Sequence, residues 1–162
     1  MNNDLIADVL QRNLGILQNT LADFSDADLL ARPCATANHT AWQLGHLISS
    51  EAWMISGCNV GAAPALPAGF ADKFTPKTAS IDDLAAFGTK AQLLDQFAKV
   101  RSASINWVKS LSQSDMSKPG PEPMKGFCPT VGHIVLLLAD HTAMHVGQMQ
   151  VVRRKLGKPI LF

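Results

Sequence analysis

The sequence predicts an all-α protein, a four-helix bundle that forms one domain over residues 1–162. Apolar residues recur at spacings of three to five along four long stretches, which is typical of amphipathic helices. No stretch of useful length alternates polar and apolar residues as a half-buried strand does. A chain of 162 residues has the size of a single domain and buries enough surface to fold without disulfides.

The first predicted helix covers residues 3–23, where one stripe of apolar side chains faces the core. Its members are Leu5, Ile6, Val9, Leu14, Leu17, Leu21 and Phe24. Ser25 and Asp28 then have the spacing of a capping box, and Pro33 cannot continue a helix. Residues 26–32 are therefore predicted to form a short connecting turn.

The second predicted helix begins at a cap supplied by Thr36 or Asn38 and runs to about Ser56, with Gly57 placed to end it. Residues 58–77 that follow are rich in glycine and proline and show no sustained periodicity, and Ser80 with Asp83 then predicts a brief helical piece that ends at Gly88. A connection of roughly 30 residues is long enough to travel the length of a bundle. We therefore expect a crossover between the second and third long helices.

The third and fourth long helices carry clear start signals. Thr89 with Gln92 forms a capping box for a helix that runs to about Leu111. Four of the nine prolines fall within residues 117–129, which predicts a loop. Thr130 is then placed to cap the last helix, whose end is marked by basic residues in its final turn and by the glycine and proline beyond them: Arg153, Arg154, Lys155, Gly157 and Pro159.

The last helix carries two histidines on its predicted core seam. Spacings of three and four join Val131, Ile134, Leu138, His141, His145, Gln148 and Val152. His141 and His145 lie four apart, so both imidazoles can reach one ion at about 2.0–2.1 Å. The second helix offers a third imidazole on the stripe formed by Trp42, His46, Ser49 and Trp53.

Three histidines with positions left open are typical of a catalytic metal site. Such an ion polarises a carbonyl or lowers the pKa of a bound water or thiol. The alternative is a pair of core histidines hydrogen-bonded to Gln148, Ser49 or backbone carbonyls. Thr142 stands where a zinc protease needs its glutamate, and the two glutamates, Glu51 and Glu122, are too few for a di-iron bundle.

The other polar residues near these positions have less specific roles. His39 and His133 fall in the first turns of their helices, which favours capping or the rim of a pocket. Glu51, Asp140 and the two spare histidines, His39 and His133, are candidates for a general base, without a spacing that selects any of them. Trp42 is expected to be core or pocket wall.

Charge and cysteine content exclude several classes of protein. Fourteen basic and thirteen acidic residues give a net charge of +1, which lacks the field that nucleic-acid binders need. The longest apolar run, residues 134–139, is too short for a membrane span, and the N-terminus does not have the form of a signal peptide. Three widely spaced cysteines without C-x-x-C favour free thiols in a reducing compartment, so we expect a soluble cytoplasmic protein.

The segments NHTAWQLGHLISSEAWM and DHTAMHVGQMQVVRRKLGKP resemble the DinB/YfiT-like superfamily of metal-binding four-helix bundles. The resemblance covers nearly the whole chain, and W-x-x-x-H and H-x-x-x-H-x-G-Q are its specific parts. It implies that His46, His141 and His145 bind a divalent metal, usually nickel or zinc, with Gly147 allowing close helix packing and Gln148 serving as a polar group beside the ligands. It also implies a homodimer and, in some branches, a transferase or isomerase that uses a low-molecular-weight thiol.

The leading hypothesis is a metal-dependent enzyme that acts on a small electrophilic molecule. The metal would bind a thiol or a hydroxide. The bound group would then be transferred to the substrate, or the substrate would be isomerised or hydrolysed. The competing hypothesis is a non-catalytic, stress-related bundle that binds a metal or small ligand.

Overall fold

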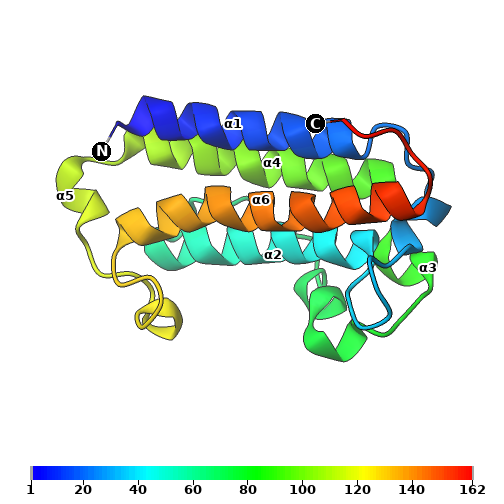
Figure 1. Ribbon diagram of the computed structural model, residues 1–162. Helices are drawn as coiled ribbons and strands as arrows, with labels where there is room; N and C mark the ends of the chain where they lie inside the picture. Colours follow the sequence, from blue (N-terminus) through cyan, green and yellow to red (C-terminus); the bar gives the residue numbers. More distant parts are fainter. Residues whose placement is uncertain (1, 162) are drawn as a thin grey trace.

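The computed structural model describes residues 2–161, and within this range it is all α-helical with no strand. Its four long helices are α1 (Asn3–Thr20), α2 (Thr40–Cys58), α4 (Lys90–Ser110) and α6 (Val131–Lys155). They pack side by side as a bundle (Figure 1), which confirms the predicted fold class. None of the described helices combines the length and the apolar character that crossing a bilayer requires.

The order of the helices around the bundle brings α2 and α6 together. Both α1 and α2 pack against α4 and against α6, so α1 and α2 lie on a diagonal. Figure 1 shows α1 and α6 running in one direction and α2 and α4 in the other. Because α2 and α4 are parallel, the chain between them must return along the bundle, and the predicted crossover is confirmed.

Short helices interrupt the two long connections. The crossover contains the 3-10 turns η2 (Ala71–Phe74) and η3 (Pro76–Thr78) and the one-turn helix α3 (Leu84–Phe87). Before α6 the chain forms α5 (Gln113–Met116), which precedes the predicted loop of residues 117–129, and η4 (Glu122–Met124), which lies within it.

The cap of α2 differs from the expected one. His39, and not Thr36 or Asn38, is the N-cap: its Nδ1 accepts the backbone N–H of Trp42 at 3.1 Å. Its Nε2–H donates to the carbonyl of Ile81 at 2.9 Å, so a fully buried imidazole joins the start of α2 to the crossover. An imidazole can cap a helix because a neutral ring presents one unprotonated nitrogen.

Two predicted capping boxes are present, whereas Thr130 stands at the N-cap position of α6 without a capping hydrogen bond from its side chain. Thr89 and Gln92 form the predicted capping box, as do Ser25 and Asp28 before the first 3-10 turn, η1 (Ala27–Leu30). The helix α2 continues through Gly57 to Cys58, so this glycine does not end it.

The core consists of two apolar clusters with a polar layer between them. One cluster contains Leu44, Phe97 and Met149, and the other contains Ile55, Trp107 and Ile134. Along α2, α4 and α6 the residues between these clusters form a buried network of Glu51, Arg101, Ser104 and Thr142. Arg101 donates from Nη2 to Glu51 Oε2 at 2.7 Å and to Thr142 Oγ1 at 2.6 Å, and Ser104 donates to Glu51 Oε1 at 2.7 Å.

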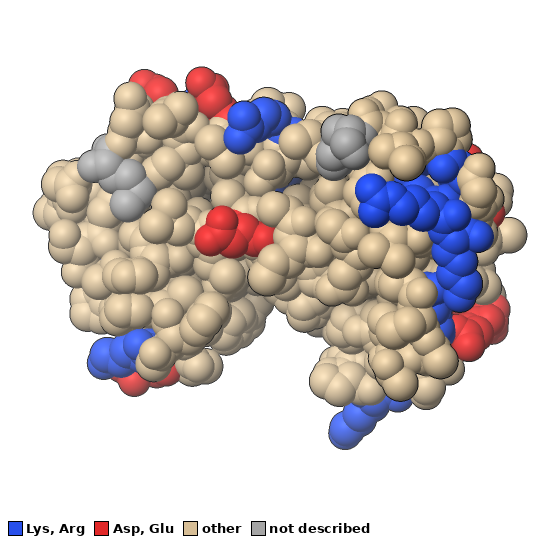
Figure 2. All heavy atoms as spheres, viewed as in Figure 1, with Lys and Arg blue, Asp and Glu red and all other residues tan. Residues whose placement is uncertain are grey.

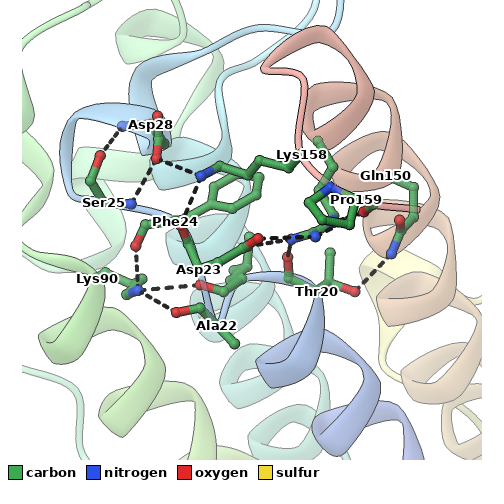
Figure 3. A network of polar contacts seen from close by, with 12 residues as sticks. Thr20, Ala22, Asp23, Phe24, Ser25, Asp28, Lys90, Gln150, Lys158 and Pro159 are labelled. Atoms are coloured by element: carbon green, nitrogen blue, oxygen red, sulfur yellow. Dashed lines mark hydrogen bonds and ion pairs between the residues drawn. The ribbon is translucent and has the colours of Figure 1, made fainter. Parts of the chain in front are cut away.

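Three cations hold the C-terminal end of α1 in place (Figure 3). Arg153 donates to the carbonyl of Thr20 at 2.7 Å and pairs with Asp23. Lys158 donates to the carbonyl of Asp23, and Lys90 donates to the last carbonyls of this segment. Carbonyls at a helix end have no partner within the helix, so these contacts satisfy them and attach the end of the chain to α1.

Candidate metal centre

Three histidines meet where α2 and α6 are neighbours. His46 comes from α2, and His141 and His145 come from successive turns of α6. One ring nitrogen from each lies within 4.8 Å of the other two, and the Nε2 atoms of His141 and His145 are 3.2 Å apart. The helices thus bring together the three residues that the sequence selected.

The side chain of Gln43 determines which nitrogen of His145 faces the cluster. Gln43 is fully buried, and its Nε2 donates to the carbonyl of Asn38 at 2.6 Å. Its Oε1 therefore faces His145 and accepts from Nδ1–H at 2.9 Å. With its proton on Nδ1, His145 presents the lone pair of Nε2 to the other histidines.

The imidazoles are held neutral. Burial, together with the neighbouring imidazoles, lowers the pKa of His145 to about 3. Burial, His46 and the positive charge of Arg101 lower the pKa of His141 to about 4. Burial also lowers the pKa of His46. At neutral pH all three rings can therefore act as ligands without first losing a proton.

The donor set fits a divalent transition metal. Two imidazole nitrogens that each lie 2.0–2.1 Å from a tetrahedral ion are about 3.3 Å apart, close to the 3.2 Å between His141 and His145. The cluster contains no carboxylate or thiolate among the described residues, and imidazole donors suit zinc and nickel. The positions that three protein ligands leave open are available to water or substrate.

The His46 ring is supported by α2 and, through Trp42, by the crossover. The Trp42 ring stacks on His46, with centroids 5.0 Å apart and planes at 11°. Its Nε1–H donates to the carbonyl of Thr75 and to Thr78 Oγ1, both at 3.2 Å. The crossover thus fixes the ring that supports His46. Trp42 is buried in the apolar core, one of the two places expected for it.

A cavity of about 290 Å³ adjoins the histidines. It is lined by His46, Ser50, Trp53, Met54, Met124, Phe127, Leu137, His141 and Met144. Figure 2 shows the molecule hollowed along one edge, between the lobe formed by residues 117–130 and the lobe formed by the crossover. Two lining residues, Met124 and Phe127, belong to the first of these lobes.

Comparison with known proteins supports the resemblance seen in the sequence. The profile of the DinB superfamily matches residues 10–149. The chain belongs to the DinB superfamily. Among solved structures, a conserved protein from Enterococcus faecalis superposes on this DinB-superfamily chain with a TM-score of 0.73 and 20% sequence identity, over 98% of this chain and 99% of the other. At that identity the likeness is one of fold, and no curated protein gave a significant match.

Both residues of the predicted DinB G-Q pair, Gly147 and Gln148, lie away from the three histidines. Gln148 is exposed and makes no hydrogen bond with the three histidines, and Gly147 is exposed with no atom within 4 Å of the position of a Cβ. The expected seam is correct through Leu138 and again at Val152, but His141, His145 and Gln148 lie off it, because the buried row of a 3.6-residue helix continues through Thr142 and Val146. His141 and His145 therefore lie at the edge of the core, facing α2, and Gly147 has no role in close helix packing within the chain.

Other residues occupy the places that were expected of Ser49 and Gln148. Ser49 donates to the carbonyls of Gly45 and His46 in its own helix, whereas the Ser50 hydroxyl lies 3.3 Å from His46 Nδ1 and lines the cavity. Gln43, and not Gln148, is the polar group hydrogen-bonded to a histidine of the cluster. Its position three residues before His46 is the signal that could have identified it, since residues three apart share a helix face.

The remaining candidates lie outside the cluster. Glu51 is buried and accepts hydrogen bonds from Arg101 and Ser104, and Asp140 is exposed. His39 is the cap of α2, as favoured, and exposed His133 lies 2.7 Å from Thr130 Oγ1 in the first turn of α6.

Proposed function

We propose that His46, His141 and His145 hold one zinc or nickel ion and that the chain is a metal-dependent enzyme acting on a small electrophilic molecule. The reaction we favour is transfer of a low-molecular-weight thiol to that molecule, with isomerisation or hydrolysis as related possibilities. The observation that carries the proposal is the meeting of three neutral imidazoles within 4.8 Å at the wall of a cavity.

The ion would supply Lewis acidity, which favours the deprotonated form of a bound thiol or water at neutral pH. The residues of the chain supply position and shelter. Gln43 holds the Nδ1 proton of His145, Trp42 supports the ring of His46, and the apolar side chains of the cavity exclude water. The Ser50 hydroxyl is the polar group beside the histidines that can exchange a hydrogen bond with a substrate.

Metal content tests the ligand set. Protein purified without a histidine tag should contain about one metal ion per chain by elemental analysis, and His141→Ala should lose it. His133→Ala is the matched control, because His133 is exposed and outside the cluster. Unchanged metal content in His141→Ala would overturn the assignment.

A non-catalytic binding bundle is the second candidate. It is favoured by the absence of a free carboxylate among the residues that line the cavity, which leaves no evident general base. Metal-loaded protein should therefore be assayed with several thiols and a panel of electrophiles. Turnover that disappears in His141→Ala supports the enzyme, whereas tight ligand binding without turnover supports the binding bundle.

We also propose that the chain acts as a homodimer, which the resemblance implied, and that it works in the cytoplasm, which its three free cysteines support. Light scattering during size-exclusion chromatography tests the oligomeric state. A mass near 35 kDa, twice that of the chain, is expected, and a mass near 17.4 kDa at micromolar concentration would contradict it.

A further inference from the structure

The cavity beside the histidines has an apolar wall that the metal site does not explain. Six of its nine lining residues are apolar: Trp53, Met54, Met124, Phe127, Leu137 and Met144. None of the nine carries a charge when the two histidines are neutral. Three of the six methionines of the chain lie here, and flexible thioether side chains adapt to ligands of varied shape.

Large apolar side chains from three separate parts of the chain are exposed at this one place. Trp53 of α2 is 48% exposed, Met144 of α6 is 57% exposed, and Phe127 of the segment before α6 is 74% exposed. A contiguous exposed apolar patch around a cavity indicates a binding surface, whereas scattered apolar residues do not. The patch is continuous with His46 and His141, which also line the cavity.

We propose that this cavity binds the uncharged apolar part, an aryl ring or short alkyl chain, of the small molecule on which the site acts. The orientation of that molecule rests on the proposed function, since its reacting group would face His46 and His141. A volume of about 290 Å³ is at the small end of ligand pockets, which suits one ring or a short chain better than a large cofactor.

The lining also selects against charge. Apart from His46 and His141, which would face the ion, the polar group in the lining is the Ser50 hydroxyl, and no Asp, Glu, Lys or Arg lines the cavity, so a charged substituent entering the apolar part would lose its hydration without gaining an ion pair. The nearby buried charges of Glu51 and Arg101 are paired with each other and do not line the cavity.

Methionine methyl resonances test the proposal directly. Protein labelled with 13C at the methionine methyl groups would be titrated with ethylbenzene, an uncharged apolar probe with one ring. The resonances of Met54, Met124 and Met144 should shift and saturate, while those of Met116 and Met149, which are buried in the two core clusters, should not move. Shifts spread over all five residues, or no shifts, would overturn the proposal.

Competition and variants define the chemistry of the site. In protein freed of metal by chelation, short-chain alcohols should displace the probe at least tenfold more effectively than carboxylates of equal length, because no ion is then present to bind a carboxylate. Met144→Lys and Phe127→Ser should each weaken probe binding at least fivefold, whereas Leu5→Ser, at an equally exposed apolar position on α1, should leave it unchanged.

Two further measurements separate this proposal from its alternatives. The metal-free His141→Ala variant should still bind the probe, so a failed metal assignment and a failed apolar pocket give different results. Shifts of Met144 that depend on protein concentration without the probe would assign the patch to contact with a second copy and overturn the proposal.

Discussion

At the scale of single residues, Gln43 and Gln148 show what a sequence pattern can and cannot reveal. Both glutamines lie three residues from a cluster histidine in sequence, Gln43 before His46 and Gln148 after His145. Only Gln43 is buried and hydrogen-bonded to a histidine. The choice between them depends on how α2 and α6 are rotated about their axes, which tertiary packing decides and spacing along one helix does not.

The Gln43→Leu variant should bind metal 10- to 100-fold more weakly, the usual cost of losing an outer hydrogen bond to a ligand. Without Oε1, His145 is free to place its proton on Nε2, and its Nδ1–H and the Asn38 carbonyl lose their partner. Affinity would be measured by competition with a chromophoric chelator. Gln148→Leu makes the same chemical change at an exposed position and should leave affinity unaltered, so equal losses in both variants would contradict the assigned role.

At the scale of elements, two glycines on α2 and α6 have opposite surroundings. A Cβ at Gly45 would lie 2.0 Å from the Phe74 ring. The lack of a side chain at Gly45 therefore allows Phe74 of the crossover to pack directly against α2, one residue before His46. Gly147 has open space around it in the middle of α6. Sequence patterns place both glycines on helices but do not show what packs against them.

These surroundings predict opposite effects of the same substitution. Gly45→Ala should destabilise the fold by about 1–3 kcal/mol, because Phe74 must move. Gly147→Ala should stabilise it by up to about 1 kcal/mol, since alanine is the better helix former and meets no neighbour. Urea denaturation of both variants checks the signs. Destabilisation by Gly147→Ala would indicate that a partner packs on this face of α6.

The buried ion pair connects three of the long helices. Arg101 of α4 bonds to Glu51 of α2 and to Thr142 of α6, and its Nε and Nη1 atoms have no hydrogen-bond partner. Burial raises the pKa of Glu51 and lowers that of Arg101, and their attraction opposes both shifts. The stabilising effect of the pair is therefore seen chiefly when one partner is removed, because the other is then left as an uncompensated buried charge.

Removing one partner should cost more than removing both. Arg101→Met leaves Glu51 buried without a counter-charge and should lower the free energy of unfolding by about 3–5 kcal/mol. Adding Glu51→Gln to that variant should recover part of the loss. A double-mutant cycle by urea denaturation measures the coupling, and strictly additive losses would show that the two charges are independent.

At the scale of the whole molecule, periodicity and capping signals were sufficient for the fold class, the four long helices and the crossover. They could not give the diagonal placement of α1 and α2 or the polar layer between the two core clusters. Those features depend on contacts between residues far apart in sequence, such as Glu51 with Arg101 and Gln43 with His145. The histidine cluster was predictable because two of its members share one helix face. The residues that surround and orient the three histidines were not predictable.

The same histidines make the stability of the whole metal-free fold depend on pH. His39, His46, His141 and His145 all have a pKa below 6.5, chiefly because of burial. An unfolded chain protonates its histidines near pH 6.5, so below that pH the unfolded state binds more protons than the folded state and stability falls with acidification. Each neutral buried histidine contributes a loss of about 1.4 kcal/mol per pH unit until its folded pKa is reached.

The urea midpoint of chelator-treated protein should therefore be level above about pH 7.5 and fall between pH 6.5 and 5. His145→Ala should reduce the number of protons taken up on unfolding by about one, and the pH dependence of stability with it. The reason is that the pKa of His145 in the folded protein is about 3, so the residue remains neutral throughout this range. Below about pH 4 the carboxylates of Asp23 and Asp28, whose pKa values are lowered by their hydrogen bonds, add a further loss. A midpoint that does not change between pH 7.5 and 5 would show that the histidines are protonated in the folded state, and hence that the cluster is more open to water than its packing indicates.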